Sequence, residues 1–301
     1  MTEILFLGTG ASVPSRGRGL PAMAVRSGRE IVLFDCGEGT QRQMMMSPMS
    51  FMKIKAIFLT HLHGDHFLGV PGLLLTMGLS GRSDPVRIVG PEGTGELLGN
   101  ILSSCGDSLP FDLSITEAYG GETFRISDYS VTAFPTEHGV PSLGFVFSED
   151  DKVGIDARKA AEMGVSATDI KMIKEGDVVN GISSEHISSG TVKGIRIVYT
   201  GDTLPCEEVR SASMGADVLV HEATFGSDQT ESAEKHNHTT SVQAAAIARE
   251  CGVRTLVLNH ISNRYKDRAP LLEEAAKIFP DTILAEDFMH LMVTRREIRS
   301  V

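Results

Sequence analysis

The chain has 301 residues, a formal net charge of −11 and 41% hydrophobic residues. Length and composition fit one large globular domain, and the negative charge argues against broad non-specific binding to nucleic acid. The four cysteines are far apart without CxxC spacing, which excludes a disulfide framework or a zinc ribbon. No apolar run reaches the roughly 18 residues of a membrane span, and the N-terminus leads directly into an apolar strand, so we expect a cytoplasmic protein.

Strands and helices alternate along both halves of the chain. Short apolar or β-branched segments predict strands near 4–8, 22–27, 31–35, 54–60, 131–135, 195–200 and 255–258. Longer segments predict helices at 66–79, 91–105, 241–251 and 271–279. A methionine-rich helical segment at 44–52 is expected to pack against a neighbouring subunit or an inserted arm, because methionine fills irregular interfaces.

The most informative stretch is HLHGDH at residues 61–66, which directly follows the predicted strand 54–60. Three imidazoles and one carboxylate in six residues make poor core material, because buried polar side chains need partners. A divalent metal satisfies them together, since imidazole nitrogen and carboxylate oxygen are ligands of zinc. The stretch therefore predicts a metal-binding loop at the C-terminal end of a strand.

Three further candidate ligands, His138, Asp202 and His260, each follow another predicted strand. The C-terminal ends of strands gather the functional loops of an α/β sheet. Together with the loop they make seven candidates: His61, His63, Asp65, His66, His138, Asp202 and His260. One tetrahedral zinc needs three or four ligands, so seven indicate two metal ions about 3.5–4 Å apart with one bridging carboxylate.

Six further segments flank the candidate ligands: FLGTG at 6–10, FDCGEGTQ at 34–41, LTH at 59–61, YTGDT at 199–203, HEATF at 221–225 and HTT at 238–240. Together they resemble the ribonuclease Z family of the metallo-β-lactamase superfamily. The resemblance runs from about residue 4 to residue 290 and implies an α/β fold, the four-layer αββα sandwich. It also implies an endoribonuclease that removes the 3′ trailer of precursor tRNA and leaves a 3′-hydroxyl on the tRNA.

The resemblance implies two Zn²⁺ ions per subunit. His61, His63, His138 and Asp202 would form the first site, and Asp65, His66, His260 and the bridging Asp202 the second. It makes Asp65 the base that serves a metal-bound hydroxide, and His238 the proton donor, steered by Glu222. The chemistry agrees, because two metal ions give hydroxide at neutral pH and a histidine can protonate the departing ribose oxygen.

Other polar residues keep alternative interpretations open. His238 could be a solvated loop histidine, and Glu222 a surface carboxylate at a strand end. By resemblance Asp35 orients the metal ligands, although an aspartate before Gly37 also initiates turns. His221 is more consistent with a core histidine than with a partner of the site.

The interval at about 150–192 is polar and glycine-rich, and it falls where ribonuclease Z inserts an arm that grips the tRNA. The resemblance therefore predicts one catalytic domain over 1–301 with an inserted substrate-binding arm, and a homodimer. Here the arm has five basic and eight acidic residues, a net charge of −3, and lacks the usual Gly-Pro element. The first loop reads PSRGRG at 14–19 where the family often has PxKxRN, which leaves the cleavage position relative to CCA open.

Basic residues beside the predicted site are candidates for phosphate contact: Arg16, Arg18, Arg42, Arg264, Lys266 and Arg268. A precursor tRNA is the expected partner. The alternatives are a zinc phosphodiesterase acting on other RNA, DNA or small phosphodiesters, and an inactive RNA-binding scaffold of the same fold. The acidic charge favours the first alternative, whereas the complete set of ligands opposes the second.

Overall fold

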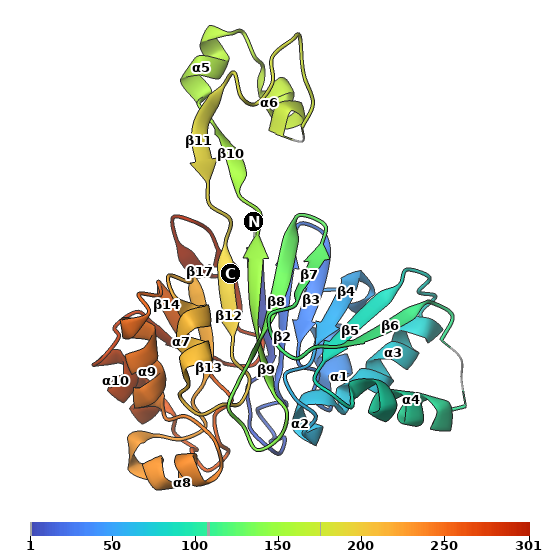
Figure 1. The fold of residues 1–301 in the computed structure, drawn as a ribbon, viewed down its shortest axis with the longest axis vertical. Coiled ribbons are helices and arrows are strands. Elements are labelled where there is room, and N and C mark those ends of the chain that lie inside the picture. Colours follow the sequence, from blue (N-terminus) through green and yellow to red (C-terminus); the bar gives the residue numbers. More distant parts are fainter. Residues whose placement is uncertain (1, 107–108, 175) are drawn as a thin grey trace.

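The computed structural model describes residues 2–106, 109–174 and 176–301. Within these residues two large β-sheets pack face to face, and helices cover the outer side of each sheet (Figure 1). This is the four-layer αββα arrangement predicted from the sequence. None of the helices in the described part of the chain is long and apolar enough to cross a membrane.

The first sheet has the strand order β17-β16-β1-β2-β3-β4-β5-β6. Its strands are β1 (Thr2–Gly8), β2 (Ala22–Ser27), β3 (Glu30–Phe34), β4 (Ile54–Phe58), β5 (Val86–Gly90), β6 (Leu113–Glu117), β16 (His290–Val293) and β17 (Ile298–Ser300). The helices α1 (Thr40–Met46), α3 (Gly69–Leu79) and α4 (Thr94–Ser104) lie on its outer face (Figure 1). Ile4 and Phe6 face the second sheet while Leu5 and Leu7 face the helices, so β1 is apolar on both sides.

The second sheet has the order β15-β14-β13-β12-β9-β8-β7. Its strands are β7 (Thr123–Ile126), β8 (Tyr129–Pro135), β9 (Leu143–Glu149), β12 (Arg196–Tyr199), β13 (Val218–Glu222), β14 (Thr255–Asn259) and β15 (Thr282–Leu284). The helices α7 (Glu207–Ser213), α9 (Ser241–Glu250) and α10 (Ala269–Ala276) cover part of its outer face. Short helices α8 (Thr230–Lys235), Phe51–Lys53 and Ser227–Gln229 lie in connecting loops.

Aromatic side chains join the two sheets. The ring of Phe58 on β4 lies 5.6 Å from that of Phe34 and 5.2 Å from that of Phe145 on β9, measured between centroids. Tyr199 at the end of β12 packs on Phe34 at 5.7 Å. These contacts hold the ends of β4 and β12 together, and the candidate ligands follow directly after both ends.

Two predicted helical segments are interrupted in the structure. The methionine-rich segment at 44–52 is helical only to Met46, where α1 ends, and again from Phe51 in the short helix Phe51–Lys53. The sequence predicted a single helix over 66–79, but the chain forms α2 (Gly64–Phe67) and then α3, with a break at Leu68. The N–H of Gly69 donates to the carbonyl of Cys36 at 2.9 Å, which anchors the break to the first sheet. A Cβ at Gly69 would lie 2.1 Å from the carbonyl oxygen of Gly37, so only glycine allows this close approach.

A separate segment leaves the end of β9 and returns at the start of β12. It consists of β10 (Lys152–Ile155), α5 (Ala157–Glu162), α6 (Ala167–Lys174) and β11 (Ser188–Val192), and we call it the arm. The two strands pair, and Ala160, Ile173 and Ile187 form a small core in the head. The arm projects away from the sandwich, from the end opposite to the loops that follow β4, β12 and β14 (Figure 1).

Candidate metal centre

Five strand ends supply the candidate ligands and their neighbours. His61, His63, Asp65 and His66 follow β4, with the last two in α2. His138 follows β8, Asp202 follows β12, and His260 directly follows β14. Glu222 is the last residue of β13, so it stands between the loops of β12 and β14, its two parallel neighbours.

The structure brings all seven candidate ligands together. Nε2 of His61 lies 3.0 Å from Nδ1 of His63, which is itself 3.3 Å from Nε2 of His138. Nε2 of His66 lies 3.3 Å from Nε2 of His260. Asp65 Oδ2 is 3.7 and 3.6 Å from those two nitrogens. Two groups of potential metal-ligand atoms, nitrogen and oxygen, therefore lie side by side and face a common centre.

Asp202 lies between the two groups. Its Oδ2 is 3.8 Å from Nε2 of His61 and 3.4 Å from Nε2 of His66. Its other oxygen, Oδ1, is buried without a hydrogen-bond donor among the described residues, although Nδ1 of His260 lies 3.3 Å away. A buried carboxylate oxygen without a donor fits a cation better than it fits a packed core.

Four histidines are oriented by hydrogen bonds on the ring nitrogen that faces away from the cluster. Nδ1 of His61 is 3.0 Å from the hydroxyl of Thr60, and Nδ1 of His138 donates to the carbonyl of Asn237 at 3.0 Å. In the same way Nδ1 of His66 contacts Asp35, and Nδ1 of His260 contacts Thr224. Each contact turns Nε2 of the ring into the cluster, as in known metal sites. The donor set therefore fits divalent metal ions.

Asp35 orients more than one neighbour, although it lies outside the ligand set. Its carboxylate is fully buried and lies 2.8 Å from Nδ1 of His66. It accepts hydrogen bonds from the N–H and hydroxyl of Thr60 at 2.8 and 2.9 Å and from the hydroxyl of Tyr199 at 2.9 Å. Of the two interpretations from sequence, the contacts favour the role of orienting the ligands.

The electrostatics of the cluster favour a bound cation. Burial and the neighbouring His66 hold the pKa of His61 well below its usual value, and burial lowers the pKa of His138, so both rings are neutral. Burial also opposes charge on His66, but Asp202 and Asp35 raise its pKa well above normal. Burial would raise the pKa of Asp202, but His260 and His66 lower it well below normal. The Asp202 carboxylate therefore stays ionised and attracts positive charge.

Next to this cluster, Glu222 and His238 form a pair. Nδ1 of His238 lies 2.7 Å from Oε1 of Glu222, whose oxygens also accept from the N–H groups of Thr203 and Thr224 at 3.1 and 3.0 Å. Burial lowers the pKa of His238, but Glu222 more than offsets this and raises it to about 9. The ring centroid of His238 is 5.6 Å from that of His260, so a cationic imidazole borders the cluster.

His221 and several basic residues take structural positions. His221 is fully buried with Nδ1 2.8 Å from the carbonyl oxygen of Glu222, as expected for a core histidine. Arg18 donates to the carbonyls of Ile261 and Ser262, and thereby ties the first long loop to the loop after His260. These contacts occupy the Arg18 guanidinium, which was a candidate for phosphate contact.

The other basic candidates fall into two groups. Arg264 lies over the ring of Phe225 at 4.8 Å, and Arg268 pairs with Glu286 at 3.0 Å. Arg16, Arg42 and Lys266 are exposed, and none of them forms an ion pair with another described residue. These three therefore remain the better candidates for contact with phosphate.

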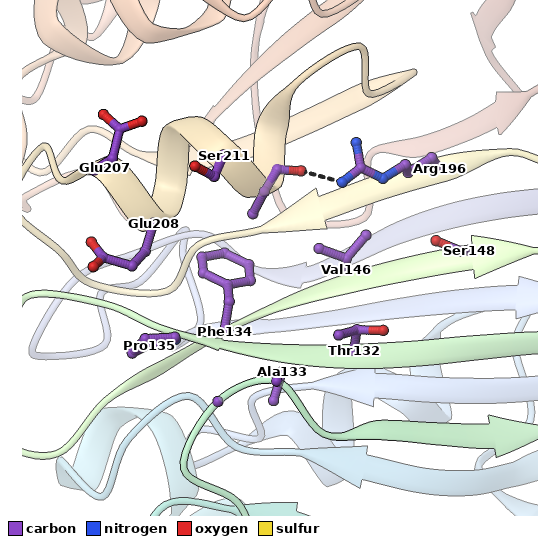
Figure 2. Close-up of a pocket in the computed structure, with 13 residues that line it drawn as sticks. Thr132, Ala133, Phe134, Pro135, Val146, Ser148, Arg196, Glu207, Glu208 and Ser211 are labelled. Carbon is purple, nitrogen blue, oxygen red and sulfur yellow. Dashed lines mark hydrogen bonds between the residues drawn. The ribbon is translucent and has the colours of Figure 1, made fainter.

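A groove of about 600 Å³ lies elsewhere, on the outer face of the second sheet (Figure 2). Phe134, Val146 and Thr132 form its floor, and Glu207, Glu208 and Ser211 of α7 form one wall. None of the seven candidate ligands lines this groove. The groove is therefore separate from the candidate metal centre.

Sequence reasoning assigned no role to several residues that shape the cluster. Thr60, Thr224 and Asn237 contact the outward nitrogens of ligand histidines, and the N–H of Ser12 donates to Asp65 Oδ2 at 2.8 Å. Thr60 and Thr224 lie next to motif residues at the ends of buried strands. A polar residue at such a position could have been predicted to contact a ligand. Ser12 and Asn237 act through backbone atoms, which leave no signal in the side-chain pattern.

A profile described as a beta-lactamase superfamily domain matches residues 30–155 and 153–261. Ribonuclease Z of Methanosarcina mazei is 42% identical over 305 residues, which cover 98% of this chain and 99% of that protein. The chain belongs to the ribonuclease Z family. Ribonuclease Z of Methanothermobacter thermautotrophicus is 40% identical and covers 97% of both chains. The crystal structure of human tRNase Z, short form, superposes with a TM-score of 0.71 at 30% identity, covering 97% of this chain and 99% of the human one.

The family assignment confirms the resemblance found in the sequence and the metallo-β-lactamase fold. This superfamily implies divalent metal binding, and the buried histidine and aspartate groups are compatible with it. Two of the segments that carry the resemblance supply the Glu222–His238 pair, since HEATF contains Glu222 and HTT begins with His238.

Proposed function

We propose that this chain is an endoribonuclease that removes the 3′ trailer of precursor tRNA and leaves a 3′-hydroxyl on the tRNA. The Glu222–His238 pair beside the ligand cluster carries the proposal, because it supplies a proton donor where a phosphodiester would meet the metal ligands. Membership in the ribonuclease Z family supports the choice of substrate.

We propose two Zn²⁺ ions as the cofactor. His61, His63 and His138 would hold one ion, Asp65, His66 and His260 the other, and Asp202 would contact both. When bound, the ions supply Lewis acidity that makes water nucleophilic near neutral pH and offsets charge on the phosphate. The order of metal affinities does not by itself select zinc over manganese, iron or cobalt. Metal analysis of the purified protein identifies the ion that is bound.

The protein groups would then divide the proton transfers between them. Although burial raises the pKa of Asp65, contacts with His260 and His66 keep it well below its usual value, so the carboxylate is ionised. Asp65 would act as the base because of its place beside the ligand nitrogens of His66 and His260, where the attacking water would lie. As the bond between phosphorus and the ribose O3′ breaks, His238 gives its proton to that oxygen. Glu222 fixes the ring of His238 and keeps it protonated at neutral pH.

We also propose that the enzyme works as a homodimer in which the arm of one subunit serves the centre of the other. The arm begins after Glu149 and returns before Arg196, while Asp202 follows the opposite end of β12. A strand rises about 3.3 Å per residue, so β9 alone separates the arm root from the centre by roughly 20 Å, and the arm points further away. Exposed Met45 and Met46 on α1 offer apolar contact area for a partner.

The test is cleavage of a 5′-labelled precursor tRNA with a short 3′ trailer, in parallel with hydrolysis of bis(p-nitrophenyl) phosphate. Asp65→Ala is the inactivating variant, and Asp84→Ala is the control, because Asp84 is an exposed partner of Lys55. We expect a single cut at or next to the discriminator base, lost in Asp65→Ala and kept in Asp84→Ala. Hydrolysis of the small diester with the tRNA intact would instead indicate a phosphodiesterase for other substrates.

A further inference from the structure

The root of the arm is where both of its strands join the second sheet. β9 and β12 pair antiparallel, with Ser148 opposite Arg196, so the outgoing and returning strands leave the sheet side by side. Beyond them the N–H of Gly194 donates to Asp151 at 3.0 Å, and Lys193 pairs with the same carboxylate at 2.7 Å. A Cβ at Gly194 would lie 2.0 Å from the carbonyl oxygen of Glu149, so the two strands stay in close contact.

On the outgoing side, the β7–β8 hairpin holds the root. Arg125 of β7 binds Asp150 through both terminal nitrogens, one of them at 2.5 Å. Lys152 pairs with Asp128 in the turn of that hairpin at 3.3 Å. Both pairs are exposed to solvent, so each contributes little alone.

On the returning side, a single arginine from the far end of the chain holds the root. Arg295 lies in the tight turn between β16 and β17, which is closed by a hydrogen bond from the N–H of Thr294 to the carbonyl of Glu297 at 2.9 Å. Its Nε donates to the carbonyl of Lys193 at 2.6 Å, and its Nη2 donates to the carbonyl of Gly194. The guanidinium thus binds two successive carbonyls at the point where the arm rejoins the core.

The third nitrogen of Arg295 connects these carbonyls to the interior. Nη1 contacts both oxygens of Asp217, at 2.8 and 3.0 Å. Asp217 is buried, accepts from the N–H of Arg196 at 2.9 Å and pairs with Arg254 at 3.3 Å. The Asp217 carboxylate is therefore shared by the first residue of β12 and two arginines, and it fixes the plane of the Arg295 guanidinium.

We infer that Arg295 is a positioning residue for the substrate, which acts by fixing the direction of the arm. This inference rests on the proposed function of the arm in tRNA binding. The arm meets the sandwich at its two root strands, so a small rotation at Lys193–Gly194 displaces the distant head by a much larger distance. A planar guanidinium with three anchored nitrogens resists that rotation better than a single ion pair does. The C-terminal hairpin thereby takes part in substrate binding without touching the substrate.

The experiment compares the full-length wild-type enzyme with Arg295→Gln, Arg295→Lys and Arg299→Gln. Arg299 lies on β17 of the same hairpin, where it pairs with Glu297 at 3.5 Å and its Nη2 lies 3.6 Å from Sδ of Met292 on β16. Both contacts stay within the hairpin, so Arg299 is the matched control. The readouts are kcat and KM on precursor tRNA, hydrolysis of bis(p-nitrophenyl) phosphate, and amide hydrogen exchange at 150–155 and 188–195.

We expect Arg295→Gln to raise KM for precursor tRNA about five- to tenfold, as suits the loss of one charged, hydrogen-bonded anchor. We expect kcat and hydrolysis of the small diester to stay unchanged, and exchange at the root to accelerate. Arg295→Lys should recover part of the loss, since it keeps the charge without the fork.

Equal KM values and equal exchange in Arg295→Gln and Arg299→Gln would overturn the inference. A parallel fall in tRNA cleavage and small-diester hydrolysis would also overturn it, because that result indicates general destabilisation. If the wild-type enzyme left precursor tRNA intact, the proposed function would fail instead. The exchange comparison would then still decide whether Arg295 fixes the root.

Discussion

Oε1 of Glu222 lies 2.7 Å from Nδ1 of His238, although β13 and the loop after α8 contribute the two residues separately. The carboxylate is nearly inaccessible to solvent, with 1% of its side chain exposed, whereas the imidazole reaches the edge of the metal centre with 12% exposed. This arrangement supports the proposed roles, in which Glu222 supplies a buried negative charge and His238 is the proton donor to the substrate.

Replacement of Glu222 by glutamine should move the alkaline limb of the pH profile to lower pH. The pKa of His238 is raised to about 9 beside Glu222, so the protonated donor is present below that value and is lost as the pH rises through it. Without the carboxylate this pKa falls, so activity at pH 8 should drop more than activity at pH 6. Single-turnover cleavage of precursor tRNA across this range measures the shift. Glu208→Gln is the control, because Glu208 is exposed on α7. An alkaline limb that is the same in Glu222→Gln and in the wild type would contradict the role of Glu222.

Replacement of His238 by alanine should affect substrates according to their leaving groups. Loss of a positioned acid typically costs about 10²–10⁴ in rate, and we expect kcat on precursor tRNA to fall within that range. Hydrolysis of bis(p-nitrophenyl) phosphate should fall much less, because p-nitrophenolate leaves without a proton. Comparison of kcat on the two substrates tests this, and equal losses would show that His238 acts through the metal ligands instead.

Replacement of Asp35 by asparagine should weaken metal binding while the fold remains. The variant keeps the size of the side chain but removes the charge that faces Nδ1 of His66 at 2.8 Å. Loss of such an orienting partner typically costs about 10–100-fold in metal affinity. Titration of the metal-free protein with Zn²⁺ measures the change. The exposed Asp84→Asn should bind like the wild type, and equal affinities of all three proteins would exclude the orienting role.

Removal of metal should lower both activity and thermal stability. A ligand that binds only the folded state stabilises it in proportion to the logarithm of its concentration over Kd, so chelation should lower Tm and added Zn²⁺ should restore it. The loss is expected because four groups of histidine and carboxylate donors converge there, and Oδ1 of Asp202 is buried without a hydrogen-bond donor among the described residues. Differential scanning calorimetry with and without chelator is the measurement, and His63→Ala should show a smaller shift than the wild type.

Mixed dimers test whether the arm acts on the partner subunit. One subunit carries Asp65→Ala, and the other has its arm shortened by a two-residue turn that joins Gly154 to Gly190, which pair across β10 and β11. Each variant alone should leave precursor tRNA uncut. After subunit exchange, about a quarter of wild-type activity should appear, because half of the dimers are mixed and each has one complete site. A mixture that stays inactive would indicate that each arm serves its own subunit.

Much of the metal centre could be predicted because its ligands follow a rule of position. His138, Asp202 and His260 are far apart in the chain, but each follows the C-terminal end of a strand, and such ends meet in an α/β fold. The layers were predictable for a similar reason, since β1 and β4 are apolar on both faces and need cover on both sides.

The orientation of each ligand could not be predicted in this way. It depends on which nitrogen of the ring is hydrogen-bonded, and the partners include a backbone carbonyl at Asn237 and hydroxyls at Thr60 and Thr224. The role of Arg18 was also hidden, because its targets are the carbonyls of Ile261 and Ser262, and carbonyls occur at every position in a sequence. The break at Leu68 depends on a close approach between Gly69 and Gly37, which only the assembled fold reveals.

The arm joins the sandwich through two adjacent strands at the end remote from the metal ligands. Its head can therefore change in length or charge without any change in the shape of the hydrolytic centre. This separation makes the arm an exchangeable part, so a chimera that carries a basic arm on this acidic chain should keep its hydrolytic rate while it acquires a different preference for RNA. With the proposed role of the arm, selection can act on the choice of substrate and on the chemical step independently, even though both reside in one polypeptide.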